Sequence, residues 1–231
     1  MTSATPQQYL KDLWFRFGIV TKAKKDTDVF LASDFNVFNY IRPDELILSW
    51  LIRDLLDVSG NHGQQGLFLC EFLNALGKEG KYLDGDRVAI QLEKGTRYFS
   101  EERVYDGRID IHVSIENYNR KFGIAIENKP WAKDRKQQII RYLSDMGKSY
   151  DDFILVYLSK GHDPSEGSIK KEELEEYKGK GLITTWSYNP DLKNWLKRCR
   201  SECQADKVRW YLADFIEYID SNFPIYNGGG Y

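Results

Sequence analysis

The chain of 231 residues is 42% hydrophobic and 29% charged, which is typical of a globular protein and excludes a disordered or fibrous one. Its 33 basic and 35 acidic residues give a net charge of −2, so overall charge does not favour strong non-specific binding to nucleic acid. Three cysteines argue against a disulfide framework, and the longest apolar run, residues 153–158, is too short to span a bilayer. The N-terminus has no signal-peptide pattern, so we expect a cytoplasmic protein without a membrane segment.

The first elements expected along the chain are helices. Residues 1–42 form an unassigned N-terminal extension, in which an aromatic-rich helix over residues 8–17 is interrupted by the charged residues 22–28. A helix from about Pro43 to Leu56 is indicated by the proline and the early acids Asp44 and Glu45 in its first turn. A further helix is expected over residues 64–76 and is ended by Gly77.

The pattern then changes to strands. Apolar residues at 88, 90 and 92 alternate with polar ones, and residues 97–104 are expected to form a second strand. Asp106-Gly107 is interpreted as a hairpin turn, which leads into a strand with Ile or Val at positions 109, 111, 113 and 115. The later elements are expected to be a strand at 122–129, a helix at 134–146, a strand at 153–158, a short helix, a strand at 182–187, and helices at 190–203 and 205–223.

This order predicts a single α/β domain over residues 43–223, followed by a tail at 224–231. The helix after the strand at 122–129 can return the chain, so that the next strand pairs in parallel. The meander before that helix is antiparallel. We therefore expect a mixed central sheet that is flanked by helices.

Charged side chains stand out in two of the apolar strands. Because side chains alternate along a strand, Asp110 and His112 share one face of theirs, and Ala125, Glu127 and Lys129 share one face of the next. If the strands are neighbours, Asp110, Glu127 and Lys129 converge. Two close carboxylates repel each other unless one is protonated or the pair binds a cation, and Mg²⁺ prefers carboxylate oxygens. With a lysine to supply positive charge or orient water, this set is suited to phosphodiester cleavage.

Three segments occur in order along this part of the chain: Arg108-Ile109-Asp110-Ile111, then Ile124-Ala125-Ile126-Glu127-Asn128-Lys129, then a helix with Gln138 and Tyr142. Together they resemble the PD-(D/E)XK nuclease superfamily, most closely its bacterial and phage branch. The resemblance runs from about residue 43 to residue 223. It implies a restriction-endonuclease-like α/β fold and hydrolysis of nucleic-acid phosphodiester bonds, preferably in DNA, with Mg²⁺ or Mn²⁺. The proline that heads the family motif is missing before Asp110.

The resemblance also implies roles for individual residues of the motif. Asp110 and Glu127 would bind the metal, and the Ile126 carbonyl would be a possible further ligand. Lys129 would act on the attacking water or on the developing phosphate charge.

The roles of other residues allow two interpretations. Glu45 matches an acidic residue that the superfamily often places near the metal, usually through water, but it could simply complement the dipole of its helix. Gln138 matches a polar residue that commonly contacts the site, or it lies on a solvated helix face. Tyr142 and His112 are more simply explained by packing. Trp131 could stack on a base or pack against the protein.

Two basic clusters bear on partners. Residues 120–141, around the motif, contain seven basic residues and two acids, and residues 193–209 contain six basic residues and two acids. Each is consistent with nucleic-acid contact or with a solvated surface. Cutting two strands would favour a homodimer. Two alternatives stay open: a catalytically silent nuclease fold used for binding or assembly, and a small-molecule enzyme with a carboxylate–metal site, although no phosphate-binding glycine loop is present.

Overall fold

The computed structural model describes residues 6–99 and 104–225, which fall into two compact units, Met1–Val37 and Phe38–Tyr231. The first unit contains the 26-residue helix α1 (Pro6–Leu31). The interruption predicted at residues 22–28 is wrong, because this segment is helical. Lys and Ala favour helix, and the Thr27 hydroxyl donates to the Ala23 carbonyl one turn earlier. No helix in the described part of the chain is long and apolar enough to cross a membrane.

A five-stranded sheet forms the centre of the second unit, in the order β1-β2-β3-β4-β5. The first three strands form an antiparallel meander, while β4 pairs in parallel with β3 and with β5. The predicted mixed sheet is therefore confirmed. The strands are β1 (Arg87–Phe99), β2 (Val104–Asn117), β3 (Arg120–Lys129), β4 (Asp152–Ser159) and β5 (Ile183–Ser187).

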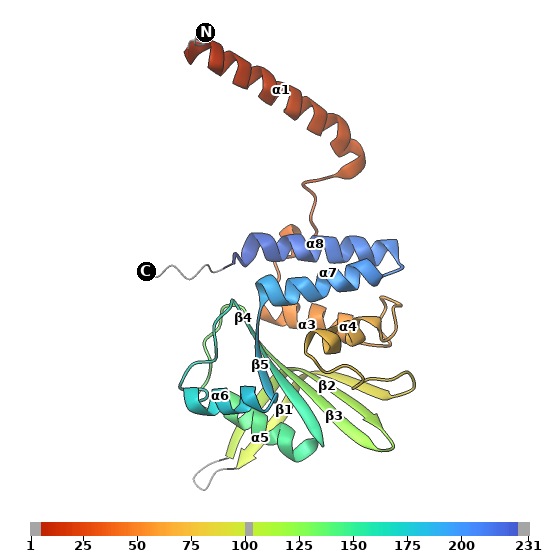
Figure 1. Cartoon of the computed structure of the whole chain (residues 1–231), viewed down its shortest axis with the longest axis vertical. Coiled ribbons are helices and arrows are strands. Elements are labelled where there is room, and N and C mark those ends of the chain that lie inside the picture. The colour runs from red at the N-terminus through yellow and green to blue at the C-terminus, as the bar shows by residue number, and fades with distance from the viewer. Residues whose placement is uncertain (1–5, 100–103, 226–231) are drawn as a thin grey trace. The chain divides into compact units, whose positions relative to one another are not determined.

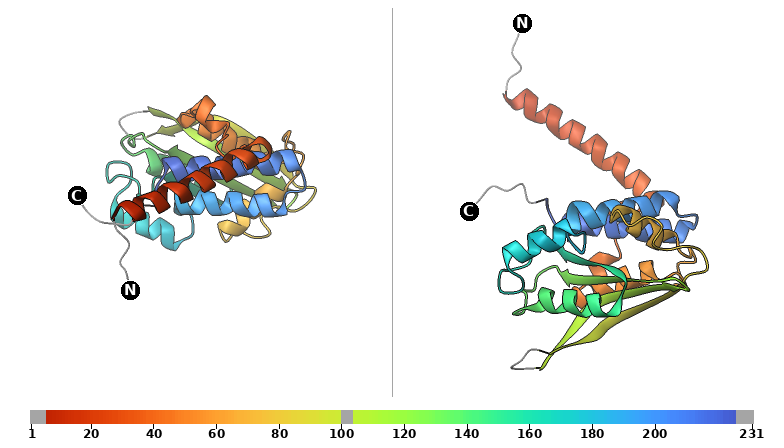
Figure 2. Two further views of the ribbon diagram at one scale, coloured as in Figure 1. Left: turned by 90° about the horizontal axis from the view of Figure 1, so that it is seen from above. Right: turned by 60° about the horizontal axis from the view of Figure 1, so that its bottom comes forward.

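Helices cover both faces of this sheet (Figures 1 and 2). One face is covered by α5 (Gln138–Ser149) and α6 (Lys171–Gly179). On the other side lie the remaining helical elements, α2 (Phe38–Ile41), α3 (Glu45–Leu56), α4 (Leu67–Ala75), the short turn η1 (Tyr188–Leu192), α7 (Lys193–Glu202) and α8 (Asp206–Asn222). Phe38, at the start of α2, is fully buried and stacks on Phe215 of α8, which joins residues 38–41 to this unit.

The strand sequences explain why both faces are covered. Ala125, Leu155 and Ile183 are register partners in one row, and they belong to the cluster packed beneath α5 and α6. Ile111 and Ile126 are partners in an adjacent row and are also buried. Strands that are buried on both faces read as nearly continuous apolar runs, as β3 and β4 do. The helix α5 provides the crossover between these two parallel strands, as the sequence predicted.

Two sequence predictions fail at the β1–β2 hairpin. Residues 97–99 continue β1 instead of starting a new strand, and Asp106-Gly107 lies inside β2, where Gly107 pairs with Thr96. The connection itself lies at residues 100–103, outside the described residues. Gly107 is needed for close approach, since a Cβ there would lie 2.9 Å from Thr96 Oγ1 and 3.1 Å from a Tyr142 ring carbon. The Asp-Gly pair therefore reflects packing and not a turn.

Two predicted helices begin later than their patterns indicated, and a third is divided into two elements. The helix expected from residue 134 begins at Gln138, because the Asp134 carboxylate is bound by Tyr157 and Ser165, and Gln137 has a positive φ of 54°. The helix expected from residue 64 begins at Leu67, after Gln65 with φ of 52°. The helix expected at 190–203 is divided into η1 and α7. Tertiary contacts and left-handed residues thus set these starts.

Candidate active site

The first site residue, Asp110, lies where β2 and β3 separate. The paired register of these strands ends at Ile111 and Ile126. Just beyond that point, Asp110 Oδ2 accepts a 2.7 Å hydrogen bond from the backbone N–H of Asn128. The side chain thus takes the place of a strand carbonyl, which fixes the carboxylate at the fork between the strands.

Glu127 and Lys129, at the end of β3, complete the expected convergence. Lys129 Nζ lies 2.6 Å from Glu127 Oε1 and 3.9 Å from Asp110 Oδ2. It also lies 3.3 Å from Oε1 of Glu45, the first residue of α3. The structure therefore gathers one ammonium group among three carboxylates. The Glu127 side chain is 1% exposed and that of Lys129 is 8% exposed, so these charges are largely withdrawn from water.

Gln138 and Tyr142 close the site from the first two turns of α5. The Gln138 amide nitrogen donates to Glu127 Oε1 and to the Tyr142 hydroxyl, while its oxygen accepts from the backbone N–H of Arg135. The Tyr142 hydroxyl in turn donates to the Arg108 carbonyl on β2. The solvated reading of Gln138 is therefore wrong: its buried amide holds Glu127. Tyr142 is packed, as expected, and also connects α5 to the strand that carries Asp110.

One buried atom in this network lacks a partner. Glu127 Oε2 forms no hydrogen bond within the described residues, although it has almost no contact with solvent. Burial, reinforced by the Asp110 charge, raises the pKa of Glu127 to about 8, and burial raises the pKa of Asp110 to about 6. Burial lowers the pKa of Lys129, but the carboxylates outweigh it and raise that pKa overall. The site therefore has too little positive charge to keep both acids comfortably ionised.

The network opens into a cleft of about 1030 Å³. Besides the residues already described, Arg108 and Arg135 line it, and so does Glu93 of β1. None of these three was predicted as a site residue: Arg108 belongs to the motif segment but was assigned no role, while Glu93 and Arg135 lie outside the motif and reach the cleft through the fold. The full lining is Glu45, Glu93, Gly95, Thr96, Gly107, Arg108, Asp110, Glu127, Lys129, Arg135, Gln138 and Tyr142.

Asn128 is a further residue whose role the sequence analysis missed. Its amide nitrogen donates to the Glu45 carbonyl at 3.1 Å and to Ser49 Oγ at 2.9 Å, and its amide oxygen accepts from the Tyr188 hydroxyl at 2.6 Å. Asn128 thus connects β3 to α3 and η1 while its backbone N–H holds Asp110. A signal was present in the sequence, since an asparagine on a face of apolar residues must find partners when it is buried.

Two residues that were weighed for the site lie elsewhere. His112 is buried and its Nε2 is 3.0 Å from Lys94 Nζ and 2.6 Å from the Tyr150 hydroxyl. This supports the packing reading of His112. Trp131 is half-exposed beyond the end of β3, and its ring centroid lies 5.8 Å from that of Phe223.

The fold and the site together define a nuclease-type α/β domain. A family model of the PD-(D/E)XK nuclease superfamily matches residues 35–217, and the chain therefore belongs to this superfamily. Membership implies nuclease activity in general, that is, hydrolysis of phosphodiester bonds. Neither the curated proteins nor the solved structures compared with the chain gave a match.

Nucleases of this superfamily typically use divalent metal ions. In the parts of the chain that the structure describes, no group of three or more His, Cys, Asp or Glu side chains is placed to hold a metal. The protein would instead offer the two carboxylates Asp110 and Glu127, with backbone, water and phosphate oxygens as further ligands, which is a common arrangement for Mg²⁺. The unpartnered Oε2 of Glu127 fits such an ion, because a cation there would compensate a buried oxygen.

Proposed function

We propose that the protein is a metal-dependent nuclease that hydrolyses phosphodiester bonds with Mg²⁺ or Mn²⁺ and prefers DNA. The observation that carries this proposal is the buried oxygen Oε2 of Glu127, which accepts no hydrogen bond from the described residues. Glu127 lies next to Asp110 and Lys129 and lines the cleft. A structural ion pair would be expected to satisfy both carboxylate oxygens. An oxygen left open at a cleft supports a site that is completed by a ligand.

In this proposal Asp110 and Glu127 hold the ion. The Ile126 carbonyl is kept as a proposed further ligand. When bound, the ion would polarise the phosphate and lower the pKa of a water molecule. The protein's own contribution is to keep the two carboxylates in place, through the backbone N–H of Asn128 and the amide of Gln138.

Lys129 supplies a fixed positive charge. Its pKa is raised, so Nζ stays protonated and can stabilise negative charge that develops on the phosphate or orient the attacking water. Glu45, 3.3 Å from Nζ, would hold the ammonium group or a water molecule on the side of α3. Arg108 and Arg135 line the same cleft and are suited to contact phosphate oxygens on either side of the scissile bond.

The test is cleavage by the purified protein. We expect DNA to be cut with Mg²⁺ or Mn²⁺, and cutting to stop with EDTA. Glu127→Ala and Lys129→Ala should each lower the rate by about 10²-fold or more while the protein stays folded. The matched controls are Glu176→Ala and Lys180→Ala, which remove the two partners of an exposed ion pair between α6 and its C-cap residue, with 2.6 Å separation. If the site variants cut as well as these controls, the proposal fails.

The second candidate function is a nuclease fold that binds nucleic acid or assembles with partners without catalysis. It is favoured by the charge of the cleft, whose lining contains four acids but three bases, so the cleft itself has no net positive charge with which to hold a substrate for cleavage. Calorimetry with Mn²⁺ separates the two candidates. A nuclease should bind the ion, and Asp110→Ala should abolish the binding, whereas a silent fold should show none. A homodimer stays a prediction that the mass of the protein in solution can test.

A further inference from the structure

The loop at residues 130–137, here called the cationic loop, joins the candidate catalytic Lys129 to Gln138. It has no regular secondary structure, yet it is held in place at several points. The Asp134 carboxylate accepts from the Tyr157 hydroxyl at 2.8 Å and from the Ser165 backbone N–H at 2.6 Å. The backbone N–H of Gln137 donates to the Gly167 carbonyl at 2.7 Å. This anchoring gives the loop a defined surface.

The anchoring also determines which charged side chains of the cationic loop form hydrogen bonds with the protein and which are exposed to solvent. Asp134 is the one acid in its sequence and is turned inward, where its oxygens are engaged. Lys133, Arg135 and Lys136 are exposed, and none forms an ion pair with a side chain that the structure describes. Arg135 in addition lines the catalytic cleft. The loop therefore presents three exposed positive charges, one of which, Arg135, borders the proposed reaction centre.

Trp131 adds an aromatic surface to these charges. Its side chain is 50% exposed, and Phe223 supports it at a centroid distance of 5.8 Å. Lys160 Nζ, at the end of β4, lies 5.8 Å from the centroid of the indole ring. Since Trp131 is two residues from Lys129, their Cα atoms are at most about 7 Å apart. The backbone that carries the indole ring therefore lies close in sequence and in space to Lys129, although Trp131 itself does not line the cleft.

From these features we propose that the cationic loop binds a single strand of nucleic acid, with an unpaired base stacked on Trp131 beside the scissile phosphate. Lys133, Lys136 and Lys160 neutralise the flanking phosphates. The inference rests on the proposed function and extends it to the form of the substrate. Aromatic side chains that alternate with basic ones are the usual means of binding single strands, since every base has a face that can stack. A paired base inside a duplex does not offer that face.

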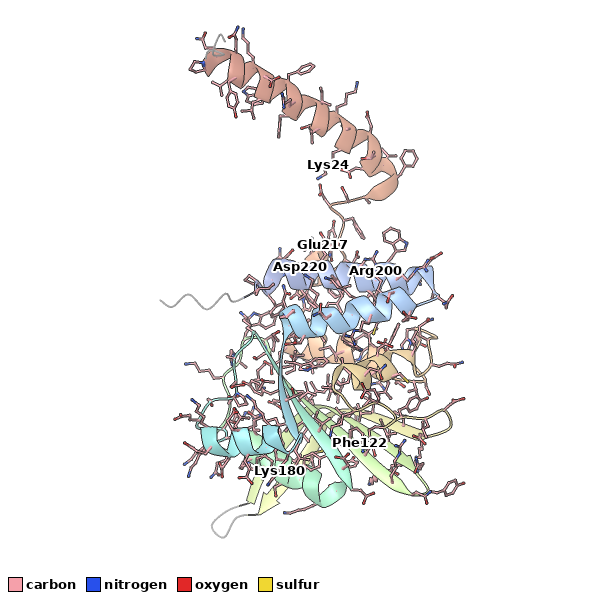
Figure 3. All side chains as sticks on the ribbon, viewed as in Figure 1. Lys24, Phe122, Lys180, Arg200, Glu217 and Asp220 are labelled. Carbon is pink, nitrogen blue, oxygen red and sulfur yellow. The ribbon has the colours of Figure 1, made fainter. Side chains whose placement is uncertain are left out.

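The chain contains a matched control surface on α7 and α8, formed by Lys197, Arg200, Arg209 and Trp210. Trp210 is 67% exposed, and these residues line a shallow hollow that shares no residue with the catalytic cleft. Figure 3 labels Arg200 in this helical layer, above the sheet. The control surface shares basic residues and an exposed tryptophan with the cationic loop, lies apart from the proposed metal site, and includes one acid, Asp206, which pairs with Arg209. Substitutions on the control surface therefore measure how much any basic surface contributes to the affinity for nucleic acid.

The first experiment compares the two tryptophans in binding. The full-length protein is titrated, in EDTA to prevent turnover, into a fluorescein-labelled single strand of mixed sequence and into the same strand annealed to its complement. We expect Trp131→Ala to weaken single-strand binding by about 5- to 100-fold, and Trp131→Phe to retain most of it. Trp210→Ala should change it by less than about twofold. Equal effects of Trp131→Ala and Trp210→Ala would overturn the inference, as would equal weakening of the duplex.

The second experiment measures charge. Lys133→Gln combined with Lys136→Gln should lower the slope of log affinity against log salt by about 1.4, because each phosphate neutralised on a single strand contributes about 0.7. Lys197→Gln combined with Arg200→Gln removes the same charge from the control surface and should leave the slope unchanged. A fall of the same size in both double variants would show that binding follows overall charge, which contradicts a site on the loop.

Cleavage separates the failure of this inference from that of the proposed function. If the protein cuts nucleic acid but Trp131→Ala alters neither KM nor single-strand binding, the cationic loop is not the strand site and the nuclease proposal stands. If Trp131 governs single-strand binding but no cleavage occurs with Mg²⁺ or Mn²⁺, the loop site stands and the nuclease proposal fails. We expect Trp131→Ala to raise KM for a single strand while kcat changes less.

Discussion

Two polar clusters are buried in the same sheet, and they differ in how completely their polar atoms are paired. The cluster proposed to be catalytic contains Asp110, Glu127 and Lys129, and the second contains His112 with Lys94 and Tyr150. Asp110 and His112 are two residues apart on β2. In both clusters a lysine and a hydroxyl-bearing tyrosine of α5 or its C-cap lie close to the strand residues.

The two clusters differ in whether a buried polar atom is left without a hydrogen-bond partner. In the catalytic cluster Glu127 Oε2 is buried without a partner, and the site opens into the cleft. Within the described residues, no atom of the His112 cluster is buried and unpartnered. A polar cluster whose buried atoms all form hydrogen bonds within the protein stabilises the fold. A cluster that leaves a buried oxygen without a hydrogen bond is suited to bind a ligand there. The comparison therefore supports the proposed catalytic role of the first cluster and a packing role of the second.

The largest expected effect on cleavage comes from replacing the Glu127 carboxylate, whose Oε2 has no hydrogen-bond partner among the described residues. Glu127→Gln keeps the shape but replaces a buried carboxylate with a neutral amide, so we expect the cleavage rate to fall by about 10²- to 10³-fold. The same change should abolish stabilisation by Mn²⁺, which for the parent protein is about 2.7 kcal/mol when the ion is at 100 times its Kd. Thermal unfolding with EDTA and with Mn²⁺ measures this stabilisation, alongside the cleavage rate.

The control for that variant is His112→Gln, in the other cluster. It should leave the stabilisation by Mn²⁺ intact, whatever it does to the stability of the metal-free protein. Were Mn²⁺ to stabilise Glu127→Gln as much as the parent protein, the distinction between an open and a closed cluster would have no functional meaning.

A second effect is expected at Asn128, which belongs to the fold and the site at once. Asn128→Ala removes an amide that serves Glu45, Ser49 and Tyr188, and leaves these buried groups short of partners. We expect the free energy of unfolding to fall by about 3 kcal/mol, since each buried polar group left unsatisfied costs about 1–3 kcal/mol. Urea denaturation provides the measurement. Asn119→Ala in the exposed β2–β3 connection is the control, and an equal loss there would contradict a special role for Asn128.

Much of this fold was predictable because the sheet is built on local periodicity. Alternation placed Glu127 and Lys129 on one face of β3, and the helix after β3 implied parallel pairing with β4. The motif itself supplied Asp110, and the structure then brought its carboxylate to within 3.9 Å of Lys129 Nζ. The face on which a strand residue lies, and the pairing of neighbouring strands, can therefore be predicted from the local sequence pattern.

The errors arose where distant parts of the chain decide a local feature. Asp106-Gly107 has the composition of a turn, but Gly107 is there because Tyr142, on another element, approaches it closely. The residues before α5 have helical periodicity, but Asp134 is drawn away by Tyr157 and Ser165. Such contacts depend on register and packing. They become visible when the strands and helices have been placed beside one another.

The smallest expected effect tests the closed cluster through pH. Burial, with the charges of Lys94 and Lys121, lowers the pKa of His112 to about 3, against 6.5 for the free side chain. Between these values the unfolded chain binds a proton that the folded protein excludes, so stability should fall as pH falls below 6.5. At about 1.4 kcal/mol per pH unit, the fall amounts to roughly 2 kcal/mol between pH 6.5 and pH 5.

This contribution is isolated by comparing the parent protein with His112→Gln, both in EDTA, by urea denaturation at pH 6.5 and pH 5. Other titrating groups are common to the two proteins and largely cancel in the difference. The parent protein should lose about 2 kcal/mol more than the variant over this interval. Parallel losses would mean that His112 takes up its proton in the folded state, and a cluster that accepts a charge so readily could not be the closed one of the pair.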